Sequence, residues 1–185
     1  MIRISAGQFK GLSLVAPPRI RATEAKVRQA LGNILQGVWE GARVIDGFAG
    51  SGALGMEAFS RGSAFVAFID SDAESVIAIR DNLRRLEAEV TSTAWRVLHL
   101  DVERALRELS KTEQLFDLIL FDPPYGGDEG KKALNSVVEC AILAPAGLVV
   151  IEHDQRTILP AVVGPLQQYQ QHRYGDTVLS FYRPT

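Results

Sequence analysis

The segment at residues 121–125 combines chemically capable side chains with a stiff backbone. Its residues, Phe121-Asp122-Pro123-Pro124-Tyr125, follow the apolar run Leu118-Ile119-Leu120. Prolines lack a backbone N–H and fix φ near −65°, so a strand must end here and the chain must leave it in an extended shape. Asp-Pro is also an ordinary strand exit. A carboxylate and an aromatic ring held open at a strand end are nevertheless well suited to contact a ligand.

A glycine-rich segment earlier in the chain is typical of a cofactor loop, and it reads Asp46-Gly47-Phe48-Ala49-Gly50-Ser51-Gly52-Ala53-Leu54-Gly55. Its glycines allow sharp turns and close approach to a ligand, and the following helix points its N-terminus at the site. The spacing of Gly50, Gly52 and Gly55 matches the dinucleotide fingerprint. Asp46 argues against a dinucleotide, because its carboxylate would repel a pyrophosphate. It favours a cationic ligand such as the amino group or sulfonium of S-adenosylmethionine.

Two further aspartates end the next two expected strands. Asp70 can accept hydrogen bonds from both hydroxyls of a ribose, which supports a nucleoside but does not separate S-adenosylmethionine from NAD. Asp101 can accept an amino hydrogen of adenine, or it can simply be the N-cap of the helix that it precedes. Together with Asp46, these acids predict an adenosine site with a positively charged end.

Alternating strand and helix patterns position these residues. We expect strands at 43–46, 64–69, 95–100, 118–121 and 148–151, and helices at 52–61, 73–86, 102–109 and 131–143. Such βαβ units are right-handed and form a parallel sheet that is covered on both faces. The segments 167–173 and 177–183 predict an antiparallel hairpin at one edge. The fold class is therefore α/β, with a seven-stranded, mostly parallel sheet that carries a C-terminal antiparallel hairpin.

The N-terminal region has its own pattern and an unusual charge. Strands at 2–5 and 12–15 predict a small hairpin, and Thr23 is a candidate N-cap for an amphipathic helix that reaches residue 35. The net charge of residues 1–28 is +5, against −7 for the remainder. A basic arm suggests a polyanionic partner, although a merely solvated segment fits the charge equally well. We expect a basic arm at 1–22 and one domain at 23–185.

Composition limits the remaining possibilities. The 185 residues contain one cysteine, Cys140, and three scattered histidines, so neither an internal disulfide nor a zinc cluster is expected, and we predict no metal. Neither a membrane span nor a secretion signal is readable, and we expect a cytoplasmic monomer. Asn82, Arg84 and Arg85 are expected on a solvated helix face. Glu152 and His153 would fit a proton shuttle, but the pattern supplies no specific role for them.

With Asp122-Pro123-Pro124-Tyr125 included, the chain resembles Rossmann-like class I S-adenosylmethionine-dependent methyltransferases that act on exocyclic amino groups. The resemblance implies that Asp122 and the Pro123 carbonyl accept the two amino hydrogens, and that Tyr125 stacks on an unpaired base. The implied catalytic residues are Asp122, Pro123 and Tyr125. The implied cofactor-binding residues are Asp46, Phe48, Ala49, Gly50, Ser51, Gly52, Asp70, Asp101, Val102 and Asp122.

The resemblance narrows when the N-terminal segments Ile4-Ser5-Ala6-Gly7-Gln8-Phe9-Lys10-Gly11 and Arg21-Ala22-Thr23 are added. The chain then is similar to the RsmD-type small-subunit ribosomal RNA guanine-N2 methyltransferases over nearly its whole length. This implies methylation of one guanine, within a ribosome assembly particle, with the hairpin as an RNA-contacting element. The implied RNA-binding residues are Arg3, Lys10, Arg19, Arg21 and Arg28. The family usually has proline at position 22, phenylalanine at position 32 and leucine at position 47.

Three other functions remain open at this point. A DNA or other nucleic-acid amino methyltransferase shares the Asp-Pro-Pro-Tyr segment, although 185 residues leave no room for a separate target-recognition domain. A protein-glutamine methyltransferase would have asparagine in place of Asp122. A non-catalytic RNA-binding assembly factor would retain the fold without needing Asp122.

Overall fold

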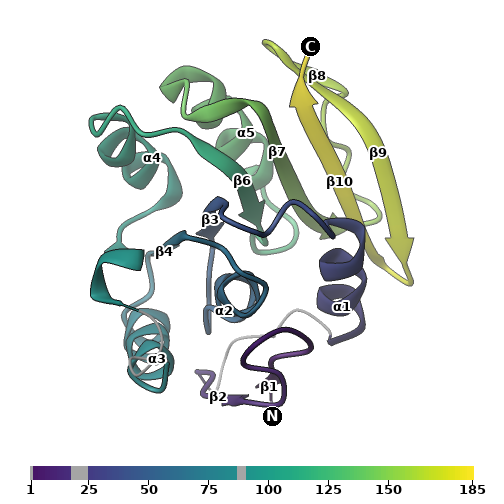
Figure 1. Ribbon diagram of the computed structural model, residues 1–185. Coiled ribbons are helices and arrows are strands. Elements are labelled where there is room, and N and C mark those ends of the chain that lie inside the picture. Colours follow the sequence, from purple (N-terminus) through teal and green to yellow (C-terminus); the bar gives the residue numbers. More distant parts are fainter. Residues whose placement is uncertain (1, 18–24, 87–90) are drawn as a thin grey trace.

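The computed structural model describes residues 2–17, 25–86 and 91–185 (Figure 1). The predicted N-cap Thr23 lies outside these residues. The helices are α1 Ala25–Ile34, α2 Ala53–Ser60, α3 Ala73–Arg84, α4 Val102–Ser110 and α5 Glu129–Cys140. The strands are β1 Ile2–Arg3, β2 Ser13–Leu14, β3 Arg43–Gly47, β4 Phe65–Asp70, β5 Trp95–His99, β6 Phe116–Phe121, β7 Leu143–Asp154, β8 Val162–Val163, β9 Leu166–Tyr174 and β10 Thr177–Pro184.

In the described part of the chain, eight strands form one sheet in the order β5-β4-β3-β6-β7-β10-β9-β8. The five strands from β5 to β7 are parallel, and β10 pairs antiparallel with β7 and with β9. This confirms the predicted α/β fold with a C-terminal hairpin at one edge. The two-residue strand β8 was not predicted and makes the sheet one strand wider than the expected seven.

Side chains alternate between two cores because successive strand residues point to opposite faces of the sheet. In β6, Leu118 and Leu120 pack in the core beneath α1, α2 and α3, whereas Ile119 and Phe121 pack in the core beneath α4 and α5. Figure 1 shows these two groups of helices on either side of the sheet. Burial on both faces explains why the central strands are nearly continuous apolar runs.

The predicted boundaries of α5 and β7 are wrong, since the helix begins at Glu129 and the strand expected at 148–151 runs from Leu143 to Asp154. The helix expected at 131–143 ends at Cys140, because Ala141 adopts the left-handed conformation with φ 46° and stops it. Leu143 is then a strand residue that pairs with Phe116. The apolar residues after Cys140 would fit a helix as well as a buried strand, so only the pairing with a neighbouring strand distinguishes the two.

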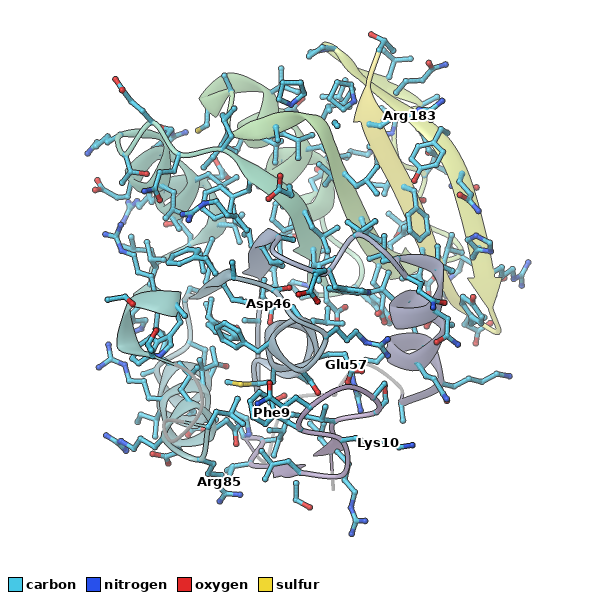
Figure 2. The ribbon with its side chains drawn as sticks, in the orientation of Figure 1. Phe9, Lys10, Asp46, Glu57, Arg85 and Arg183 are labelled. Atoms are coloured by element: carbon cyan, nitrogen blue, oxygen red, sulfur yellow. The ribbon has the colours of Figure 1, made fainter. Side chains whose placement is uncertain are left out.

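Buried polar groups fasten the N-terminal hairpin β1–β2 to α2 and α3. Glu57 of α2 is 2% exposed and accepts hydrogen bonds from the Ser5 N–H at 2.8 Å and from Arg61 Nε at 3.0 Å. Asn82 of α3 is fully buried, accepts from the Val15 N–H at 2.8 Å and donates to the Val15 carbonyl at 2.9 Å. Figure 2 shows Glu57 between α2 and the hairpin loop. The hairpin is thus joined to the domain by directional bonds at both of its ends.

Strand order reverses between β3 and β6. The chain proceeds outward from β3 through β4 to β5, and then returns to place β6 on the other side of β3. The carboxyl ends of these strands lie together, with Gly47 paired to both Ile69 and Phe121. Such a switch point leaves a crevice beyond the strand ends, where open α/β sheets bind their ligands.

Candidate active site

A cavity of about 710 Å³ occupies the predicted place beyond the strand ends. Its walls contain acids at the carboxyl ends of three strands, namely Asp46 within β3, Asp70 at the end of β4 and Asp122 directly after β6. Asp46 lies near the centre of the molecule in Figure 2. The volume is within the range of pockets that enclose cofactor-sized ligands. The structure therefore brings the two chemically distinctive segments of the sequence into one site.

The glycine-rich loop directs its backbone donors toward carboxylates. Gly50 N–H donates to Asp70 Oδ2 at 2.7 Å, and Gly55 N–H donates to Asp46 Oδ2 at 2.8 Å. Gly50 and Gly52 have positive φ values of 56° and 75°, which favour glycine. A loop that binds pyrophosphate instead presents its N–H groups to the ligand. The hydrogen bonds thus argue against the dinucleotide interpretation of the glycine spacing.

The carboxyl group of Asp46 is 1% exposed. Burial raises its pKa well above the ordinary value, the hydrogen bond from Gly55 lowers it, and the charges of Asp122 and Asp70 raise it further. A positively charged ligand in the cavity would stabilise the ionised form of Asp46. The site is therefore electrostatically prepared for a cation.

The charged side chains of the cavity wall that the structure describes all have one sign. The described lining residues include eight carboxylic acids but no lysine, arginine or histidine. The acids are Asp46, Asp70, Asp72, Glu74, Asp101, Asp122, Glu129 and Glu152. Such a lining disfavours nucleotide phosphates and fits a nucleoside that carries an ammonium and a sulfonium group. S-adenosylmethionine is such a ligand, and the residues present fit it.

Two predicted nucleoside contacts also have structural roles. Asp70 Oδ1 accepts the Asp72 N–H at 2.8 Å, so each Asp70 oxygen already has one donor. A carboxylate accepts about four hydrogen bonds, which leaves capacity for ribose hydroxyls. Asp101 is the N-cap of α4 and accepts the Arg104 N–H at 2.9 Å, so the N-cap alternative is confirmed. Asp101 and Val102 also line the cavity, and their contact with adenine stays a prediction.

The chemical end of the cavity is formed by the segment after β6. Asp122 is half-buried, Pro123 is buried, and the Tyr125 side chain is exposed at the rim. The Tyr125 hydroxyl lies 3.4 Å from Glu152 Oε1 and 3.4 Å from Thr177 Oγ1. These contacts connect Tyr125 with β7 and β10 at the wall of the cavity that Asp122 also lines. Thr177 of β10 was not identified from the sequence, because nothing in the local pattern shows that the C-terminal hairpin reaches the site.

The pair Glu152 and His153 is divided by strand alternation. Glu152 lines the cavity, whereas His153 points to the other side of β7 and contacts Ser180 Oγ through Nε2 at 2.8 Å. The shuttle interpretation of this pair is therefore wrong. Side chains alternate between the two faces of β7, so Glu152 shares a face with Val150, and His153 lies on the other face.

The basic residues predicted to bind RNA are in different environments. Arg3 and Lys10 are exposed, and Figure 2 shows Lys10 at the periphery of the hairpin. Arg19 and Arg21 lie outside the described residues. Arg28 is 3% exposed and its Nη2 donates to the Arg3 carbonyl at 3.2 Å, which contradicts a role in binding phosphate from solvent.

The expected solvated face of α3 is only partly solvated. Arg84 is exposed and pairs with Asp81, whereas Asn82 is buried and also donates to the Ser51 carbonyl at 2.9 Å. The Arg85 guanidinium donates to the Ser13 carbonyl in β2 at 3.0 Å. Asn82 therefore connects the hairpin with the cofactor loop, a contact that the helix pattern does not reveal.

The described part of the chain contains no cluster of three or more potential metal-ligating side chains. Within the same residues, every helix is too short or too polar to span a bilayer.

The chain is similar to known proteins over almost its full length. The family model described as conserved hypothetical protein 95 matches residues 2–183. The Bacillus subtilis protein YlbH, provisionally named an rRNA methyltransferase, is 36% identical over 98% of both chains. The ribosomal RNA small subunit methyltransferase D of Escherichia coli K12 is 30% identical, over 98% of this chain and 89% of its own. The solved structure of the Escherichia coli protein yhhF, provisionally named a methyltransferase, superposes with a TM-score of 0.84 at 29% identity, over 99% and 97% of the two chains.

Proposed function

The chain belongs to the conserved hypothetical protein 95 family, together with the ribosomal RNA small subunit methyltransferases D, and on this premise we propose that it methylates the exocyclic N2 amino group of a guanine in small-subunit ribosomal RNA. The methyl donor is S-adenosylmethionine, and the product is S-adenosylhomocysteine. The observation that carries the proposal is the position of Asp122-Pro123-Pro124-Tyr125 on the wall of the acidic cavity.

The cofactor end supports this chemistry through charge. Asp46 is buried beside the glycine loop and its ionisation is favoured by a cation, while Asp70 has capacity for ribose hydroxyls. When bound, S-adenosylmethionine supplies an electrophilic methyl group on a sulfonium. Asp46 and Asp70 would hold this cofactor in the cavity whose wall Asp122 shares.

The base end prepares the nucleophile. The amino group of guanine is a weak nucleophile because its lone pair is conjugated with the ring. Asp122 and the Pro123 carbonyl accept its two hydrogens and so direct the lone pair at the methyl group. As the new N–C bond forms and the S–C bond breaks, the amino nitrogen loses one proton to Asp122 or to water. Tyr125, exposed at the rim, offers a ring on which the flipped base stacks.

We expect basic side chains to bind the phosphate backbone of the RNA. The acidic lining would repel RNA phosphates, so these must lie on the rim and beyond it. Arg3 and Lys10 are exposed on the hairpin. Arg19 and Arg21, which lie outside the described residues, stay predicted RNA contacts. We expect the assembly particle, rather than free RNA, to be the natural partner, with the enzyme acting as a monomer in the cytoplasm.

The test is a methyl-transfer assay with labelled S-adenosylmethionine and small-subunit particles that lack the modification. Asp122→Ala should abolish transfer and leave S-adenosylhomocysteine affinity within about threefold, because its carboxylate acts on the amino group. Asp128→Ala is the matched control, since Asp128 is exposed in the same loop. Mass spectrometry should find N2-methylguanosine. Methyl transfer only to duplex DNA, or equal loss with Asp128→Ala, would contradict the proposal.

A further inference from the structure

The cavity contains a buried carboxyl group to which the methyl-transfer step described above gives no role. Glu152 is 5% exposed and lies near the end of β7. It lines the same cavity as Asp122, on the side away from the glycine loop. A buried acid is costly to maintain, so its retention in a ligand pocket calls for a partner or a role.

The sheet register places Glu152 beside Asp122. Phe121 pairs with Ile151 in the parallel strands β6 and β7, so Asp122 and Glu152 follow at the same level. Both are one residue beyond side chains of the α4–α5 core and therefore point to the opposite face of the sheet. Neighbouring strands lie about 4.8 Å apart, which is close enough for one planar base to touch both side chains.

A buried cation interacts with Glu152. Burial lowers the pKa of Arg28 in α1, and the charges of Glu57 and Glu152 act against this lowering. A guanidinium stays charged in proteins, so Glu152 has a positive neighbour. The Tyr125 hydroxyl is 3.4 Å from Glu152 Oε1. Since a carboxylate accepts about four hydrogen bonds, Glu152 can serve Tyr125 and a substrate base together.

We propose that Glu152 selects guanine by accepting the N1–H of the base whose 2-amino group lies against Asp122. This inference rests on the proposed function and names a further residue in the same site. In guanine, N1 is a donor adjacent to the 2-amino group. In adenine and cytosine, the ring nitrogen adjacent to the amino group is an acceptor, whose lone pair would face the Glu152 carboxylate. A mismatched buried acceptor is rejected strongly, so Glu152 adds base choice to a segment whose own chemistry suits any amino group.

The decisive probe is 2-aminopurine, which keeps the 2-amino group but has an acceptor at N1. The wild-type reaction is first mapped by mass spectrometry. Small-subunit rRNA is then prepared with guanine or 2-aminopurine at that position and assembled with the small-subunit proteins. Wild-type protein should show kcat/KM at least about 100-fold lower on 2-aminopurine, since a site built for a donor rejects an acceptor. Equal rates on the two RNAs would overturn the proposal without any variant.

The variant Glu152→Gln relaxes the requirement, because its amide oxygen can accept the guanine N1–H and its amide nitrogen can donate to the 2-aminopurine N1. We expect the preference for guanine over 2-aminopurine to fall from at least about 100-fold to near unity, mainly through a higher kcat/KM on 2-aminopurine. Glu152→Asp should keep the preference at a lower rate. Glu139→Gln, exposed on α5, is the control and should match the wild type.

Other outcomes separate a structural role from base selection. S-adenosylhomocysteine affinity and thermal unfolding are measured for every variant. If Glu152→Gln lowers kcat/KM equally on both RNAs, Glu152 only holds α1 through Arg28, and the inference is wrong. If the wild type methylates neither RNA and Asp122→Ala changes nothing, the proposed function itself fails, which is a distinct result.

Discussion

Asn82→Ala tests whether one side chain couples the N-terminal hairpin to the cofactor loop. Asn82 is fully buried and makes three bonds, from the Val15 N–H at 2.8 Å, to the Val15 carbonyl at 2.9 Å and to the Ser51 carbonyl at 2.9 Å. Alanine removes all three and leaves the hairpin end and the loop without a shared partner.

The magnitude follows from the surroundings of each orphaned group. Val15 is 37% exposed, so water can replace its two bonds at about 0.5–1 kcal/mol each. Ser51 is 4% exposed, and leaving its carbonyl unsatisfied costs about 1–3 kcal/mol. The free energy of unfolding should therefore fall by about 2–5 kcal/mol. Each ~1 kcal/mol of loosening in the loop weakens cofactor binding about fivefold.

Urea unfolding followed by circular dichroism measures the loss, and calorimetry with S-adenosylhomocysteine measures affinity. Asn82→Asp retains an acceptor for Val15 but neither donor, so it should be destabilised as well. Arg84→Ala removes only an exposed pair with Asp81 and should change stability by less than about 0.5 kcal/mol. A loss below about 1 kcal/mol with unchanged affinity in Asn82→Ala would refute the coupling.

Three further substitutions probe the site and its support. Because the pKa of Asp46 is raised in the folded state, the folded protein keeps a proton that the unfolded chain releases near pH 3.9. Above that pH, the free energy of unfolding therefore falls by about 1.4 kcal/mol per pH unit, until the pH reaches the pKa of the folded state. Asp46→Asn should therefore be more stable than the wild type in urea at pH 7, equal to it at about pH 3.5, and weaker in S-adenosylmethionine binding; an unchanged difference across this range would contradict the assignment. Gly55→Ala should destabilise by about 1–3 kcal/mol in the same assay, because its Cβ would lie 2.2 Å from the buried Phe68 ring, and wild-type stability would show that the helix shifts freely. Neutralising Arg3 and Lys10 together should weaken RNA binding and reduce its salt slope by up to about 2 in filter-binding assays, with cofactor affinity unchanged; an unaltered slope would remove these residues from the interface.

Some departures from the resembled family become understandable in three dimensions. Glycine stands at position 47, and a Cβ there would lie 2.6 Å from the Phe121 ring, which packs edge-on against Phe48 at 6.0 Å. Glycine stands at position 32, where a Cβ would lie 2.3 Å from the Arg61 guanidinium. Larger neighbours thus occupy the space that each missing side chain vacates, as close packing requires.

The sequence alone determined the parts of this protein that depend on local physics. Apolar alternation along the chain predicted the βαβ order, and two prolines after Asp122 predicted a strand end held open. The glycine spacing after Asp46 predicted a loop that lines the cavity, as the structure shows. The structure retains these features because steric limits and hydrophobic periodicity act over a few residues and do not depend on the rest of the chain.

Tertiary structure decided which residues meet. The buried state of Arg28, the donors that bind Asp46 and Asp70, and the separation of Glu152 from His153 all depend on segments far apart in the chain. Thr177 reaches the cavity only because β10 pairs with β7. The charge and the apolar pattern of the sequence cannot specify such contacts. Burial shifts a pKa or removes an arginine from solvent, and burial depends on neighbouring residues that only the folded chain brings together.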